Sequence, residues 1–194
     1  MVASTASNIN CGDPVSGLIQ RDAHLTGLLR GEVLVETRAH SAWGAAVTAQ
    51  MYLPLEREKA WQQLIDYPRW VQYFPDISQS RVLSQENTGM SSTTGESKRL
   101  YQAASKTFLM LTVQVGVYLR VVETACQQIR FRLESGNFND FSADLKLKDL
   151  ANGTLLTYVV QATPTIPIPS MFIQQAIHLD LPANMRRMRQ VLCS

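Results

Sequence analysis

The hydrophobic residues that follow the first thirty positions are spaced as in a β-strand. Val33 and Val35 alternate with Glu32, Leu34 and Glu36, and from Val47 onward the apolar residues again keep one parity. A period of two is typical of a strand with one buried face. The pattern therefore predicts one long strand over residues 31–53, and Gly44 is the position at which it would bend.

The spacing then becomes helical between Pro54 and Pro68. Four apolar side chains fall on one helical face there, and Pro68 ends the pattern because proline breaks a helix interior. A second short helix is expected over residues 69–73, before Pro75. The four apolar side chains are Ala60, Trp61, Leu64 and Ile65.

Further strand-like segments follow without another helix. In two of them every second residue is apolar and its neighbours are charged or polar, which is the signature of an antiparallel sheet with one face in water. Asn152-Gly153 then predicts a tight hairpin, because both residues tolerate a positive φ. The segments are residues 77–85, 95–106, 108–123, 127–134 and 141–149, with 154–162 as the last partner.

The chain closes with a helix after a proline-rich loop over residues 164–169. Ser170 is a plausible N-cap, and Pro182 is expected to kink or interrupt the helix. A stripe of apolar residues beyond it must pack against something. The stripe consists of Leu181, Met185, Met188 and Leu192.

The order of strand, two short helices, about six strands and one long helix is an α+β layout, with helices on one face of an antiparallel sheet. Residues 1–30 are rich in Ser, Thr, Asn and Gly. We expect them to form a tail that is partly ordered at most, near residues 25–29. Residues 31–194 are expected to form the domain.

Three stretches, taken together in order and spacing, carry a family resemblance. The first runs from Tyr52 through Asp66-Tyr67 to Phe74-Pro75, the second from Gly136-Asn-Phe to Asn152-Gly-Thr, and the third from the proline-rich loop to Leu192. Together they resemble the START-like (SRPBCC) superfamily and, within it, the polyketide cyclase / coenzyme Q-binding branch. The resemblance implies a helix-grip fold, in which a curved antiparallel sheet of about six to seven strands wraps around a long C-terminal helix.

What the resemblance implies about function is a deep apolar cavity between that sheet and that helix. The leading hypothesis is a protein that binds or carries a hydrophobic small molecule, such as a lipid, an isoprenoid or quinone, or a polyketide. A polyketide cyclase/dehydratase is the second hypothesis, and a protein-interaction or chaperone-like module without a ligand is the third. Fold alone does not decide among them.

Candidate ligand-binding residues come from the expected gate, sheet face and closing helix. The spacing of Gln175 and His178 places them on one face of that helix, where they would orient the polar end of a ligand; the alternative is a histidine at the helix edge. Trp70 and Phe74 are either a lid or core aromatics. We expect a cavity of at least roughly 300 Å³. The full candidate set is Trp70, Phe74, Tyr118, Phe131, Phe141, Val159, Met171, Phe172, Gln175 and His178.

The net charge of +2 provides no global field that would attract nucleic acid, and none is expected as a partner. Local features allow a transient membrane contact. Arg186, Arg187 and Arg189 are either solvated cations at a helix C-terminus or a site for anionic head groups. The apolar stretch over residues 165–172 is either a membrane-touching lip or a packed connection.

Recognisable catalytic spacing is missing, so an enzymatic role is left open and no catalytic residue is assigned. Cys11, Cys126 and Cys193 are too far apart in sequence to suggest a zinc site. We expect neither metal nor cofactor. Few cysteines, no apolar leader and no membrane span favour a soluble protein in the reducing cytoplasm.

Overall fold

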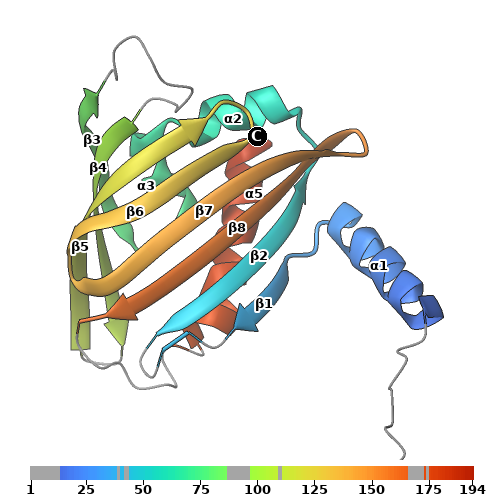
Figure 1. The fold of residues 1–194 in the computed structure, drawn as a ribbon, viewed down its shortest axis with the longest axis horizontal. Helices are drawn as coiled ribbons and strands as arrows, with labels where there is room; N and C mark the ends of the chain where they lie inside the picture. The colour runs from blue at the N-terminus through green and yellow to red at the C-terminus, as the bar shows by residue number, and fades with distance from the viewer. Residues whose placement is uncertain are drawn as a thin grey trace, which may run out of the picture.

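The computed structural model describes residues 14–38, 40–41, 44–86, 97–108, 111–165, 173 and 175–194. In this part of the chain, one open antiparallel sheet of eight strands curves in front of the C-terminal helix (Figure 1). The strands are β1 (Leu34–Arg38), β2 (Ala45–Leu53), β3 (Ile77–Glu86), β4 (Ser97–Phe108), β5 (Leu111–Thr124), β6 (Gln128–Gly136), β7 (Phe138–Leu150) and β8 (Gly153–Pro164). Their order in the sheet is β1-β2-β8-β7-β6-β5-β4-β3. The predicted α+β architecture is therefore confirmed, with one or two strands more than expected.

The extra strand arises because residues 31–53 form a hairpin and not one bent strand. β1 and β2 pair antiparallel, with Leu34 opposite Gln50, so the chain reverses between them. Gly44 is needed for close approach: a Cβ there would lie 2.5 Å from Thr163 Oγ1 and 2.7 Å from the Ala162 carbonyl oxygen. The prediction of a single strand was wrong because the apolar parity continues on both sides of the reversal.

The two predicted short helices are confirmed. They are α2 (Arg57–Leu64) and, after the 3₁₀ turn η1 (Tyr67–Arg69), α3 (Trp70–Tyr73). Two side chains fasten this segment to itself: Trp70 Nε1 donates to the Leu64 carbonyl at 2.9 Å, and the Tyr73 hydroxyl donates to the Gln63 carbonyl at 3.0 Å. Both helices cover one end of the sheet (Figure 1).

Pro182 interrupts the closing helix, as the sequence predicts. The chain forms a wide π turn, η2 (Ala176–Asp180), before the regular helix α5 (Leu181–Leu192). The N–H of Leu181 bonds to the Ala176 carbonyl, five residues back. Proline lacks an N–H and its ring clashes with the carbonyl four residues earlier, so a wider turn relieves both problems. Beyond it Met185, Met188 and Leu192 are buried on the sheet side of α5.

The predicted alternation in β6 and β7 is also confirmed. The inner face, which is turned toward α5, carries the buried Ile129, Phe131, Leu145 and Leu147. Leu133 and Phe141 on the same face are half-buried against that core, whereas Arg132, Lys146 and Lys148 on the outer face are exposed. The outer face of the sheet therefore meets water and the inner face supplies the core.

The hairpin between β7 and β8 lies where Asn152-Gly153 predicts it, but for a different reason. The positive φ of 49° belongs to Ala151, and neither Asn152 nor Gly153 has one. Gly153 is instead required by packing, since a Cβ there would meet the Leu53 carbonyl oxygen and lie 2.7 Å from the Tyr52 hydroxyl.

Residues 14–29, which the sequence analysis assigns to the N-terminal tail, form helix α1 (Pro14–Leu29). Leu28 is buried, whereas Leu25 and Leu29 are exposed. Gly31 follows with a φ of 92°, the left-handed conformation that commonly ends a helix. Figure 1 shows α1 beside the sheet, outside the layers that form the core.

Candidate functional site

A buried polar cluster closes one end of the inner face. Lys98 Nζ lies 2.8 Å from Glu123 Oε1, and both side chains are mostly buried. The Tyr67 hydroxyl donates to the same carboxylate oxygen at 2.6 Å. Burial and this carboxylate raise the pKa of Tyr67 well above its usual value. These contacts attach η1 to β4 and β5, and we call the region the closed end.

An aromatic cluster continues from the closed end along the inner face. Trp70 meets the Phe131 ring edge-on, with 5.0 Å between ring centroids, and stacks on Phe74 at 5.8 Å. Phe74 in turn lies 6.0 Å from the ring of Tyr158 on β8. Aromatic pairs at such distances contribute about 0.5–1.5 kcal/mol each beyond their buried area.

Past these rings the packing opens into a hollow of about 170 Å³. Its walls come from α3 and from strands β3, β4, β5, β7 and β8. An apolar cavity of about 150 Å³ holds a benzene-sized molecule, so this hollow accepts one ring or a short hydrocarbon segment. It is smaller than the expected 300 Å³. The lining consists of Trp70, Phe74, Ile77, Gln102, Ala104, Val115, Val117, Phe138, Phe141 and Tyr158.

Of the described lining residues that lie in the sheet, two have side chains that can form hydrogen bonds: Gln102 and Tyr158. Gln102 Nε2 donates to Ser80 Oγ at 3.2 Å, which leaves its amide oxygen as an acceptor. Among the described residues the Tyr158 hydroxyl has no hydrogen-bond partner, and burial raises the pKa of that phenol. Tyr158 therefore remains protonated and can donate a hydrogen bond.

The structure brings together three of the predicted site residues at this hollow: Trp70, Phe74 and Phe141. Phe131 is buried beneath Trp70 and does not reach it. Gln175 and His178 are exposed and are not among the lining residues, so the structure gives them no part in this hollow. Met171 and Phe172 lie outside the described residues.

Tyr118 and Val159 were assigned to the wrong face of the sheet. Tyr118 lies between the buried Val117 and Leu119 on β5, so it points outward, where it is 37% exposed. Val159 follows the inward-facing Tyr158 on β8 and therefore faces outward as well. Both strands carry apolar residues at both parities, so periodicity could not distinguish the two faces.

Several lining residues were missed by the sequence analysis. Gln102 and Ala104 share the parity of the buried Leu100, and Val115 shares that of Val117. Parity counted from one buried residue in each of β4 and β5 would have identified them. Phe138 lies next to a bulge in the β7–β8 pairing, which no sequence signal marked.

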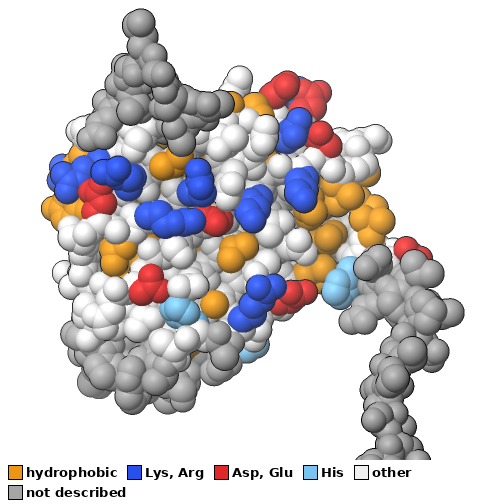
Figure 2. Space-filling view, in the orientation of Figure 1, with side chains coloured by type: hydrophobic (Ala, Val, Ile, Leu, Met, Phe, Trp, Pro, Cys, Tyr) orange, Lys and Arg blue, Asp and Glu red, His pale blue; other side chains and the backbone are white. Residues whose placement is uncertain are grey.

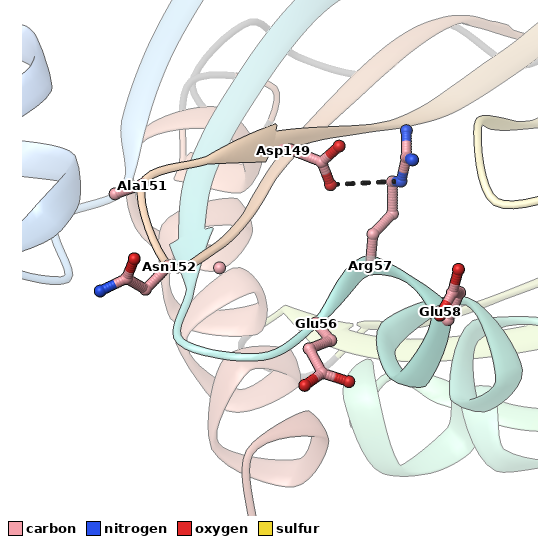
Figure 3. A pocket seen from close by; sticks show the side chains of 7 residues that line it. Glu56, Arg57, Glu58, Asp149, Ala151 and Asn152 are labelled. Atoms are coloured by element: carbon pink, nitrogen blue, oxygen red, sulfur yellow. Dashed lines mark ion pairs between the residues drawn. The ribbon is translucent and has the colours of Figure 1, made fainter.

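A second, larger hollow of about 370 Å³ lies at the surface between the start of α2 and the β7–β8 hairpin (Figure 3). Arg57 Nε lies 3.3 Å from Asp149 Oδ1 there. Figure 3 shows Arg57 reaching toward Asp149, whereas Glu56 points away from this pair. With three carboxylates and one guanidinium in its wall, this open groove does not suit a hydrophobic molecule.

The arginine cluster near the C-terminus fastens α5 to the rest of the molecule. Arg187 Nε donates to the Gln72 carbonyl at 2.7 Å, and Arg189 Nε donates to the Tyr52 carbonyl at 2.9 Å. Two of the three cations are thus engaged with the backbone of α3 and β2. Arg186 is exposed.

The described part of the chain contains neither a metal-binding cluster nor a membrane-spanning helix. No three His, Cys, Asp or Glu side chains come together there in a way that would hold a metal ion. None of the described helices is both long enough and apolar enough to cross a membrane.

The fold and the apolar hollow agree with a family profile. Residues 53–189 match the family described as polyketide cyclase / dehydrase and lipid transport. The match spans most of the chain, so the protein belongs to this family. A comparison with curated proteins gives no match.

Solved structures of START-like proteins share the fold. A START superfamily protein from Mycobacterium smegmatis aligns with a TM-score of 0.60 at 17% identity, covering 76% of this chain and 96% of its own. The Zhui aromatase/cyclase from a Streptomyces species aligns with 0.60 at 11% identity, covering 77% and 93%. A STAR-related lipid transfer protein from Xanthomonas axonopodis gives 0.56 at 15%, covering 82% and 99%. These likenesses establish the helix-grip fold.

Proposed function

We propose that the protein binds or carries a hydrophobic small molecule and that the hollow beside Trp70 and Phe74 receives one end of it. The observation that carries this proposal is the lining of the hollow. Of its ten described lining side chains, eight are aliphatic or are Phe or Trp, and the other two are Gln102 and Tyr158. A mostly apolar concave site with a few polar groups is the usual form of a small-molecule site.

The lining also favours an uncharged ligand. None of the ten lining residues carries a charge, and placing a carboxylate or an ammonium group against them would cost its hydration without compensation. The Tyr158 hydroxyl can donate to an oxygen acceptor on the ligand. A ring that bears a carbonyl oxygen, as in a quinone or an aromatic polyketide, satisfies both conditions.

Cyclase/dehydratase chemistry is the second candidate. The Tyr158 hydroxyl favours it, because a buried phenol next to an apolar hollow can polarise a carbonyl. Such chemistry also requires a group that accepts a proton. The ten lining residues include no His, Asp, Glu or Lys, so binding or carriage is the better supported function.

Saturable uptake of the neutral fluorophore N-phenyl-1-naphthylamine tests the proposal. We expect wild type to bind it and Ala104→Leu, which fills the hollow, to lose about tenfold or more in affinity, roughly 1.4 kcal/mol. Ala103→Leu is the matched control, because Ala103 is the next residue on β4 and has the opposite parity. Circular dichroism establishes that both variants are folded.

Equal binding by both variants would show that the fluorophore binds elsewhere. Absence of binding to wild type, together with extraction of the purified protein that yields no hydrophobic molecule, would overturn the proposal. An interaction module without a ligand would then be the better description. A cyclase would be indicated if wild type converted a linear aromatic-polyketide precursor and Tyr158→Phe did not.

A further inference from the structure

The outer face of the sheet, opposite the hollow, carries an excess of positive charge across strands β3 to β7. Figure 2 views this face and shows a band of Lys and Arg side chains with few acidic groups among them. Two carboxylates, Glu134 and Asp144, lie within the band. Six exposed cations make up what we call the outer basic face: Arg81, Arg99, Arg120, Arg132, Lys146 and Lys148.

The arrangement is electrostatically unfavourable for an isolated sheet. Arg99, Arg120 and Arg132 lie directly opposite one another on three neighbouring strands. Like charges in that position destabilise strand pairing. Glu134 bonds to Arg99 and Arg120, and Asp144 lies 2.8 Å from Arg132, so only part of the charge is balanced.

The other three cations of the face have no carboxylate partner among the described residues. Arg81 lies over the ring of Tyr101 at 5.3 Å, and no ion pair involves Lys146 or Lys148. Arg130 has the same parity as Arg132 on β6 and is half-buried, and its Nε has no hydrogen-bond partner among the described residues. Because the whole chain has a formal charge of only +2, this face concentrates positive charge that other surfaces balance.

Aromatic side chains lie within the same face. Tyr101 and Tyr118 touch each other with 5.0 Å between ring centroids, and Arg99 lies over Tyr118 at 5.6 Å. Tyr118 remains 37% exposed. Tyrosine is favoured where a protein meets the head-group level of a bilayer, because its ring is apolar and its hydroxyl is polar.

We propose that the outer basic face docks on a membrane surface that contains anionic phospholipids. Cations attract the phosphate-bearing head groups, and Tyr118 is positioned at head-group depth. Single-stranded nucleic acid is less suitable, because it needs ring faces open for stacking. Here the rings of Tyr101 and Tyr118 contact each other, and a guanidinium group lies over each of them. This inference is independent of the proposed ligand, because it concerns the opposite face of the sheet.

Co-sedimentation with vesicles tests the proposal on the full chain. Wild type is expected to bind phosphatidylcholine vesicles that contain phosphatidylglycerol, to bind pure phosphatidylcholine far more weakly, and to dissociate as salt is raised. Each cation near an anionic surface raises the affinity for the vesicle about fivefold, which corresponds to roughly 1 kcal/mol. The triple variant Arg81→Gln/Lys146→Gln/Lys148→Gln should therefore bind about a hundredfold more weakly. It leaves no carboxylate without its partner.

The control variant Arg30→Glu/Lys59→Gln lowers the net charge by the same three units at exposed positions elsewhere. It should retain wild-type vesicle binding. An equal loss in both variants would indicate an effect of net charge alone and overturn the proposal, as would no binding by wild type or equal binding to neutral vesicles. Binding of RNA or DNA that depends on the same three residues, without vesicle binding, would identify a nucleic-acid face instead.

Discussion

Along the inner face of one sheet, the end at Glu123 and the end at Phe141 are built differently. At the closed end, Tyr67 and Lys98 bond to the Glu123 carboxylate, and neighbouring side chains such as Leu64 are fully buried. At the other end, which we call the open end, Phe141 is half-buried beside the hollow. A polar network secures the helices at the closed end, whereas mostly apolar side chains surround the space for a ligand at the open end.

Because of this difference, the stability of the fold and the binding of a ligand should depend on different residues. Breaking a buried ion pair leaves an uncompensated charge in the interior, so changes at the closed end should act on folding. At the open end the lining is already incomplete, so changes there should act on what the hollow accepts.

Removing the carboxylate of the closed end should cost the most. Glu123→Ala leaves Lys98 buried without its partner and removes the acceptor of the Tyr67 hydroxyl. The free energy of unfolding should fall by about 3–5 kcal/mol, measured by urea denaturation. Glu134→Ala on the outer face is the control, and its loss should be about 1 kcal/mol or less. Similar losses for both variants would refute the special role of the closed end.

Truncating an aromatic at the open end should cost less and affect binding more. Phe141→Ala is expected to lower the free energy of unfolding by about 2 kcal/mol, below the usual range for a fully buried Phe. It should also enlarge the hollow and change the affinity for N-phenyl-1-naphthylamine. Phe131→Ala, at a buried position that does not line the hollow, should lose about 3–5 kcal/mol. The reverse order of stability losses would contradict the comparison.

High pH should weaken the region around the closed end. Burial raises the pKa of Tyr73 from 10.0 to about 12, so the folded state keeps a proton that the unfolded chain loses above pH 10. Stability from this group is fully present below pH 10 and declines between about pH 10 and pH 12. Unfolding measured across that range should show the decline, and Tyr73→Phe should make it shallower. An unchanged slope in the variant would assign the alkaline loss to other groups.

The smallest effect on stability is expected for Tyr158→Phe. The Tyr158 hydroxyl has no partner among the described residues, so its removal should change the free energy of unfolding by less than about 1 kcal/mol. Affinity for 2-acetylnaphthalene, which carries a carbonyl acceptor, should fall about three- to tenfold. Affinity for 2-ethylnaphthalene, which has no acceptor, should be unchanged. Calorimetric titration with both compounds distinguishes the two causes: loss of a hydrogen bond weakens binding of 2-acetylnaphthalene only, whereas a change in the shape of the hollow weakens binding of both.

The sequence predicts the architecture better than the site, for a physical reason. In β6 and β7, charged residues alternate with apolar ones, so the pattern reveals which side chains face inward. In β5 and β8, both parities carry apolar residues, and Tyr118 and Val159 were placed on the wrong face. Family resemblance implied a cavity, but its position depends on pairing across five strands.

The hairpin of β1 and β2 illustrates a second limit. The apolar parity of residues 33–35 and of residues 47–53 is compatible with one strand or with two, because a reversal leaves both buried faces on the same side of the sheet. Close packing of Gly44 against Thr163 and Ala162 decides the outcome, and that contact joins residues more than a hundred positions apart. No local pattern carries such information.

We expect the open end, and not the closed end, to receive a neutral hydrophobic molecule. A methyl NMR titration with 2-acetylnaphthalene tests it most directly. The Ala104, Val115 and Val117 methyl signals should shift saturably, while those of Ala60 and Leu64 at the other end remain unchanged. Shifts of equal size at both ends, or no shift at Ala104, Val115 and Val117, would contradict it.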